Sequence, residues 1–267
     1  MAARRDDRDD DDLADEISEE QVAIAPSDVA DPQAIVDAKI PKDIRGRYEV
    51  FSYRNAAVIL NETRKKQFEE ILGVLRSFSL TTKMIRTAGG NESEIPKLFS
   101  KILHPLGWRE TAVQGDLLIR QISKQQVGTD KGGKPKFERQ EVQFTRTNFL
   151  DGHKIDYVKD RVAFDLEWNS KDQTFDRDLY AFSAFAQCGV VDAAVLVTRG
   201  VSMTPFLRSL GPALTKEGKI ETTKAGAPRP TSAKYGASTT WMGKLLYRLN
   251  AGRNGGCPVL AIGITPE

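Results

Sequence analysis

Histidine and cysteine are scarce in this chain of 267 residues, which contains two of each. His104 and His153 are too few for a nuclease built on a catalytic histidine and a histidine-ligated metal. A Ser–His–Asp hydrolase would have to use one of them. Cys188 and Cys257 are too few for a disulfide framework, and neither belongs to a metal-type pair. The scarcity of His and Cys does not limit a site built from Asp and Glu carboxylates.

Long apolar runs are also lacking, because no stretch approaches the roughly 18 to 20 residues that cross a bilayer. The N-terminus, MAARRDDRDDDDLADEISEE, has no hydrophobic signal core. We therefore expect no membrane association and a reducing, cytoplasmic location.

What the chain does have is a composition typical of soluble globular proteins, with 40% hydrophobic and 28% charged residues. The net charge of +2 hides an asymmetry, because residues 1–20 carry three Arg and ten Asp or Glu. The rest of the chain carries more basic than acidic residues, which is compatible either with a polyanionic partner or with an ordinary solvated surface. We expect an acidic, disordered tail over residues 1–40 and one folded domain over residues 41–267.

Hydrophobic periodicity predicts alternating strands and helices. We expect an early strand within residues 47–60, amphipathic helices over 61–78 and from 91, and a strand over 115–122. The polar stretch 123–140 is expected to be an exposed basic loop or hairpin. A hairpin over 154–169, a helix over 175–188, a strand from Val191, an exposed excursion over 216–240, a helix and a final strand follow. Hairpin, helix and strand in this order indicate an α/β fold.

The hairpin KIDYVKDRVAFDLEWN, residues 154–169, is the most informative segment. Alternation along its second arm places Val162, Phe164, Leu166 and Trp168 on one face. The other face then carries Ala163, Asp165, Glu167 and Asn169. Asp156 lies close to Asp165 if the hairpin closes around residues 159–161.

Asp156, Asp165 and Glu167 would repel one another, so a hard divalent cation between them is expected to make their proximity tolerable. Mg²⁺ suits such a site because it binds a few carboxylates and keeps waters for substrate oxygens. The alternative is a surface hairpin whose acids are balanced by Lys154, Lys159 and Arg161.

This hairpin resembles the active-site hairpin of the PD-(D/E)XK nucleases, in which one strand supplies an Asp and the next an acid, a spacer and a Lys. Here no Lys stands two residues beyond the acid. A frame of Asp165 with Glu167 resembles the BamHI variant, and one of Glu167 with Asn169 resembles the BglII/BstYI group. The order of elements from Tyr48 onward is also similar to that group. The resemblance implies a restriction-endonuclease-like core with a central mixed β-sheet flanked by helices.

By this resemblance the chain is expected to be a homodimeric type II restriction endonuclease that hydrolyses double-stranded DNA with Mg²⁺ at a short palindromic site. Asp156, Asp165 and Glu167 are the expected metal ligands. Asn169 could only orient water or phosphate, since an amide accepts no proton at neutral pH. Glu94, at the start of an early helix, is either a further catalytic carboxylate or a helix-start Glu.

Polar residues that follow the catalytic strand are placed to contact DNA. The candidates are Ser170, Lys171 and Asp172, with Lys134 and Lys136 in the basic stretch as phosphate contacts. Asp172 could instead cap the next helix. Two other functions stay open: a DNA-binding or regulatory protein whose metal site has decayed, and a structure-selective repair nuclease.

Overall fold

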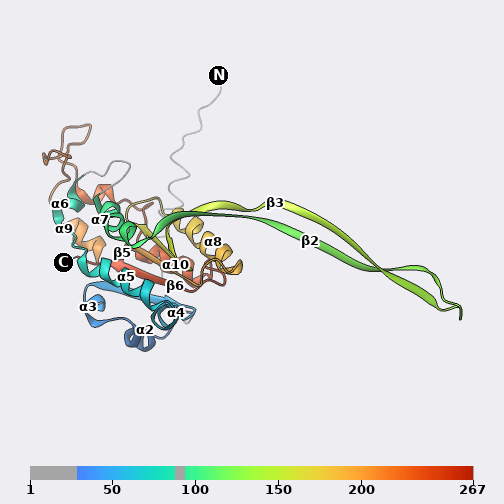
Figure 1. Cartoon of the computed structure of the whole chain (residues 1–267). Coiled ribbons are helices and arrows are strands. Elements are labelled where there is room, and N and C mark those ends of the chain that lie inside the picture. Colours follow the sequence, from blue (N-terminus) through green and yellow to red (C-terminus); the bar gives the residue numbers. More distant parts are fainter. Residues whose placement is uncertain (1–28, 88–93, 267) are drawn as a thin grey trace, which may run out of the picture. The chain divides into compact units, whose positions relative to one another are not determined.

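A computed structural model describes residues 29–87 and 94–266 (Figure 1). None of the helices in those ranges is long and apolar enough to cross a membrane. The chain forms two compact units. Among the described residues, the larger unit comprises those up to Thr111 and those from Ile155 onward, and the smaller is Ala112–Lys154.

A six-stranded mixed sheet organises the fold, in the order β1-β6-β5-β4-β3-β2. Strands β4, β5 and β6 run parallel, β1 pairs antiparallel with β6, and β3 pairs antiparallel with β4. This confirms the predicted α/β fold with a mixed sheet. The strands are β1 (Tyr48–Tyr53), β2 (Arg109–Thr129), β3 (Pro135–Lys159), β4 (Val162–Glu167), β5 (Ala193–Arg199) and β6 (Val259–Ile264).

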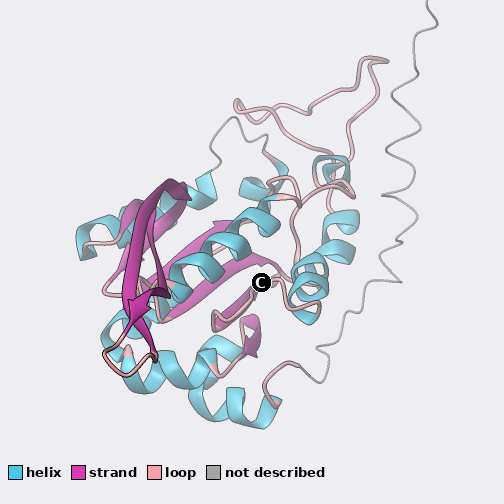
Figure 2. Cartoon of the chain, turned by 90° about the vertical axis from the view of Figure 1, so that its right-hand side faces the viewer, coloured by secondary structure: helices cyan, strands magenta, loops and turns pink. Residues whose placement is uncertain are grey.

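Helices lie on both faces of the strands in the larger unit (Figure 2). The sequence predicts one helix over residues 61–78, whereas the structure has two, with a break at Arg64. The helices are α2 (Gln33–Lys39), α3 (Lys42–Arg45), α4 (Ala56–Thr63), α5 (Lys65–Ser77), α6 (Thr82–Arg86), α7 (Glu94–Leu103), α8 (Thr174–Gln187), α9 (Met203–Ser209) and α10 (Met242–Asn250), with 3-10 turns η1 (His104–Leu106) and η2 (Thr231–Lys234).

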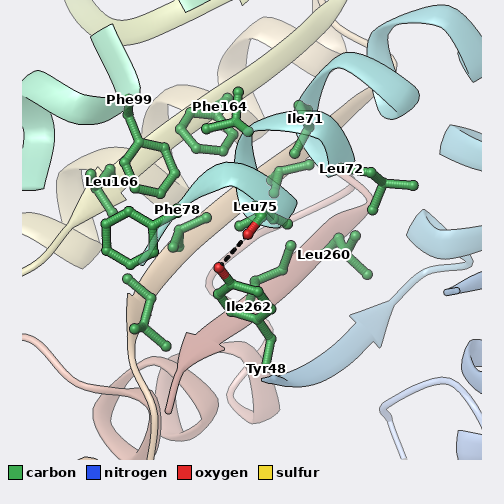
Figure 3. Packing of buried hydrophobic residues seen from close by; sticks show 14 of the residues in the cluster. Tyr48, Ile71, Leu72, Leu75, Phe78, Phe99, Phe164, Leu166, Leu260 and Ile262 are labelled. Carbon is green, nitrogen blue, oxygen red and sulfur yellow. Dashed lines mark hydrogen bonds between the residues drawn. The ribbon is translucent and has the colours of Figure 1, made fainter. Parts of the chain in front are cut away.

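Strands β4, β5 and β6 are buried along their whole length, as parallel strands covered on both faces must be. On one face, Phe164 stacks on Phe99 of α7, and Phe99 in turn contacts Phe78 (Figure 3). The Tyr48 hydroxyl on β1 donates to the Leu75 carbonyl over 2.7 Å, which ties the end of α5 to the sheet. Helix α8 contacts β4 and β5, and α10 contacts β6.

The folded part of the chain starts earlier than residue 41. Val36 on α2 and Ile40 are buried in the main hydrophobic cluster, and Ala30 forms a β-bridge with Tyr53. The Asp31 carboxylate accepts a hydrogen bond from the Asn55 main chain at 2.9 Å. The prediction that residues 29–40 belong to a disordered tail is thus wrong, because Val36 and Ile40 pack in the hydrophobic core. Residues 1–28 lie outside the described part.

The smaller unit is a two-stranded antiparallel ribbon, called the arm here, made of the outer parts of β2 and β3. Its turn is fixed by Asp130, whose carboxylate accepts from the main-chain N–H groups of Gly132 and Lys134. The predicted exposed basic hairpin over residues 123–140 is confirmed, although the arm is much longer. Its described residues are mostly exposed, and they include the apolar side chains of Leu118, Ile122, Val127, Phe137, Val142, Phe144 and Phe149.

Candidate active site

The predicted hairpin closes through a two-residue turn. Asp160 and Arg161 both have positive φ, 44° and 70°, as a type I′ hairpin turn requires. Their side chains are held in place, because Asp160 accepts from Gln67 at 2.8 Å and Arg161 forms an ion pair with Asp192 at 2.5 Å. These contacts offset the strain of two non-glycine residues in the left-handed region.

The hairpin brings Asp156 on β3 and Asp165 on β4 into contact. The main-chain N–H of Asp156 donates to Oδ1 of Asp165 over 2.6 Å. Asp165 and Glu167 are two residues apart on β4, so their side chains project from the same face of the strand. Both are buried, with 2% and 8% of their surface exposed. Their proximity follows from the strand pairing that the sequence predicted.

Burial and mutual repulsion raise the pKa values of all three acids. The pKa of Asp165 is raised well above its usual value, first by burial and then by the charges of Asp178 and Asp156. Burial, and after it Asp178, raises the pKa of Glu167 to about 8, although a hydrogen bond from Ser170 acts in the opposite direction. Burial is also the main cause of the raised pKa of Asp156. Burial and repulsion therefore favour either protonation of these carboxylates or the binding of a cation beside them.

Asp178 is a fourth carboxylate of the site, and the sequence analysis missed it. It lies on α8, is buried, and its charge raises the pKa of each of the three predicted acids. A signal was available: Phe175, Asp178, Leu179 and Phe182 have the i, i+3, i+4, i+7 spacing of a buried helix face. A carboxylate on such a face needs a compensating group or a function.

Two oxygens of the site suit a hard cation. Oδ2 of Asp165 and Oε2 of Glu167 are buried and have no hydrogen-bond partner among the described residues. A divalent ion would satisfy both atoms and offset the repulsion between them. The fit is incomplete, since within residues 29–87 and 94–266 no three Asp, Glu, His or Cys side chains converge closely enough to hold an ion.

Two further predicted residues are exposed. Asn169 is exposed, and its side-chain amide donates to the main-chain carbonyl of Lys234 over 3.1 Å. Glu94 is the exposed first residue of α7. In the described part of the chain, no hydrogen bond or ion pair joins Glu94 to Asp156, Asp165 or Glu167. The structure thus gives Asn169 a structural contact and Glu94 the position of a helix-start acid.

The residues after β4 are used within the fold. The Ser170 side chain hydrogen-bonds to Glu167. Lys171 is exposed and forms an isolated β-bridge with Thr239. Asp172 forms an ion pair with Lys244 of α10 at 2.9 Å. It does not cap α8, whose N-cap is Gln173, so the predicted alternative role of Asp172 is wrong.

The two predicted phosphate contacts of the basic stretch lie in the arm. Lys134 and Lys136 are exposed next to its turn, and Lys136 pairs with Glu138 at 3.1 Å.

Arg199, at the end of β5, ties the strand that carries Glu167 to the segment before α10. It is buried, and its Nε donates to the carbonyls of Trp168 and Thr240, each over 3.0 Å. The carbonyl of Glu167 itself accepts from the hydroxyls of Thr198 and Thr240 at 2.7 and 3.1 Å. The backbone on which the Glu167 carboxylate stands is therefore held from two sides.

Comparison with known proteins agrees with this geometry. The family model described as "Restriction endonuclease BglII/BglIII" matches residues 48–264. No curated protein matches the chain. The matched range runs from the first residue of β1 to the last residue of β6, and so includes the whole sheet, the hairpin and the arm.

Proposed function

Since the chain belongs to the BglII/BglIII restriction endonuclease family, and is thereby a type II site-specific deoxyribonuclease, we propose that it uses Mg²⁺ to hydrolyse double-stranded DNA at a short palindromic site. The products would carry 5′-phosphate and 3′-hydroxyl ends. The observation that supports this proposal best is the pair of buried carboxylate oxygens on Asp165 and Glu167 that have no hydrogen-bond partner among the described residues.

Asp156, Asp165 and Glu167 would hold the metal. When bound, Mg²⁺ lowers the pKa of a coordinated water and relieves charge on the phosphate. The chain contributes the geometry: the Asp156 N–H directs one oxygen of Asp165, which leaves the other for a ligand. The hydrogen bond from Ser170 orients Glu167 in the same way. Waters and phosphate oxygens would complete the ion's coordination, as Mg²⁺ prefers.

A palindromic site implies a two-fold symmetric dimer, and the arm supports this part of the proposal. A ribbon of two strands has no core of its own and is at best marginally stable in isolation. Exposed apolar side chains such as Phe144 and Phe149 would be covered if the arm packed on a second copy of the chain.

Cleavage of plasmid DNA tests the proposed activity. With Mg²⁺ the protein should yield discrete fragments, and Asp156→Ala should abolish cleavage while it leaves DNA binding largely in place. Asp43→Asn, which alters an exposed acid of α3, is the control and should cleave normally. A smear of products would favour a structure-selective repair nuclease. Intact DNA that is nevertheless bound would favour a regulatory protein.

A further inference from the structure

A long exposed segment starts and ends at the carboxyl edge of the sheet. Strands β4 and β5 are parallel, and Glu167 pairs with Thr198 close to the edge where both strands end. The chain leaves this edge through α9 and returns to it before α10, and the intervening residues 211–240 are mostly exposed. Figure 1 shows this segment as a loop beyond α6 and α9. Ligands of open α/β sheets bind at the carboxyl edge.

The returning end of this segment is bonded to residues of the proposed site. The Thr240 hydroxyl donates to the Glu167 carbonyl over 3.1 Å, and the Thr240 main-chain N–H donates to the Ser170 carbonyl over 2.9 Å. The main-chain N–H of Asp172 donates to the Ser238 carbonyl, also over 2.9 Å. A ligand bound to this segment would therefore be held by an element that is fixed to the end of β4.

Two turns of the segment share one sequence pattern and one geometry. They are Thr-Lys-Glu-Gly at 215–218 and Thr-Lys-Ala-Gly at 223–226. In each turn the glycine N–H donates to the threonine carbonyl, over 3.0 and 2.9 Å, and the threonine N–H donates over 2.8 Å to the carbonyl four residues further on. The two glycines have φ angles of 82° and 79°, in the left-handed region that favours glycine. Each turn thus presents a lysine at its second position, Lys216 in one and Lys224 in the other.

The charges of the segment are used in two ways. Arg229 and Lys234 are held by the fold, since they pair with Glu221 at 2.6 and 3.2 Å. The side chains of Lys216 and Lys224 are exposed, and within residues 29–87 and 94–266 they form no hydrogen bond or ion pair. The whole segment carries five Lys or Arg and two Glu, so it is a basic surface suited to a polyanion.

We propose that Lys216 and Lys224 bind phosphates of the DNA backbone away from the scissile bond, so that the 211–240 segment holds the duplex beside Glu167. The proposal rests on the nuclease function and assigns backbone binding to this segment. A lysine ammonium on its flexible stem binds a phosphate as a point charge. Long exposed loops that keep a defined main-chain structure are commonly functional.

The salt dependence of DNA binding tests this role. The affinity for a mixed-sequence duplex is measured without metal, by fluorescence anisotropy at several NaCl concentrations. Lys216→Gln with Lys224→Gln should reduce the slope of log affinity against log salt by about 1.8, since each lost phosphate contact contributes about 0.9. Lys216→Arg with Lys224→Arg should keep the wild-type slope, because a guanidinium also binds phosphate. An unchanged slope in the glutamine pair would overturn the proposal.

The control pair removes the same charge from the opposite edge of the sheet. Lys65 and Lys66 are exposed at the start of α5, next to Arg64, whose Nε donates over 2.7 Å to Asp192 just before β5 begins. Lys65→Gln with Lys66→Gln should leave the slope at its wild-type value. A reduction equal to that of the first glutamine pair would show an effect of net charge alone, and it would also overturn the proposal.

This measurement can be separated from the nuclease function because it involves neither metal nor cleavage. If the wild type binds the duplex but leaves plasmid DNA intact with Mg²⁺, the nuclease function fails while the slopes still decide the role of the two lysines. If the wild type cleaves and the slopes are equal, the nuclease function stands and the phosphate contacts are refuted.

Discussion

The main-chain N–H of Asp156 donates to the carboxylate of Asp165 over 2.6 Å, so the backbone of one strand orients the acid of the next. The antiparallel pairing of β3 and β4 places the donor opposite the acceptor, and the tight turn at Asp160 and Arg161 fixes that pairing. One oxygen of Asp165 is thereby used within the protein, and the other is left for a ligand.

Asp165→Asn should separate activity from stability. The amide oxygen can still accept from the Asp156 N–H, but it is a poor Mg²⁺ ligand, so cleavage should fall by about 1,000-fold or more. Since a buried, repelled charge is removed, the melting temperature at pH 8 should rise by a few degrees. Calorimetry and plasmid cleavage measure the two effects. A variant less stable than the wild type would show that the Asp165 charge is compensated in the fold.

The hairpin could be predicted from the sequence because local rules determine it. Strand alternation identified the faces of β4, and antiparallel pairing around residues 159–161 required Asp156 and Asp165 to meet. Burial of β5 and β6 follows from their largely apolar sequences. These features depend on residues close together in the chain.

Other features depend on distant residues and were missed. Asp178 joins the site because α8 packs on β4, and Asn169 is diverted by the Lys234 carbonyl, 65 residues further along. The sequence analysis started the folded domain at residue 41 and missed α2. This helix is short and buries only Val36, so it leaves little hydrophobic pattern in the sequence. The length of the arm could not be predicted from the sequence, because a polar ribbon without a core has little hydrophobic periodicity.

Arg199→Lys should weaken the connection between β5 and the segments on either side of the site. A Lys ammonium cannot reproduce the planar guanidinium, which reaches Trp168, Thr240 and Thr239 and lies 5.0 Å from the Tyr235 ring centroid. The free energy of unfolding should fall by about 2 kcal/mol. Urea denaturation measures it. Arg54→Lys, at an exposed site, is the control and should differ little.

Substitution of arm residues should change the oligomeric state. Val142→Thr with Phe144→Ser removes two exposed apolar side chains, and their loss from a dimer interface should weaken association at least tenfold. Sedimentation velocity over a range of concentrations measures the change. The control pair Ile220→Ser and Tyr247→Ser removes similarly exposed apolar groups from the larger unit. Equal dimerisation of both double variants would exclude the arm from the interface.

The stability of the metal-free protein should depend on pH through Glu167. Its pKa is raised to about 8 in the folded state, above that of the unfolded chain, which is about 4.3. The folded state therefore retains a proton that the unfolded state has released. This contribution to stability is complete below about pH 4 and is lost as the pH rises through 8. Asp165 and Asp156, whose pKa values are also raised, act with the same sign.

Glu167→Gln isolates this effect, because glutamine does not ionise. The variant should gain stability relative to the wild type as the pH rises from 5 to 8.5, by on the order of 3 kcal/mol. Thermal melts in EDTA across this range measure the difference, and Glu69→Gln on the exposed face of α5 should show none. The difference should shrink when Mg²⁺ is added, since an ion bound to the wild-type carboxylates would offset their repulsion. A pH-independent difference would mean that Glu167 is ionised in the folded protein throughout.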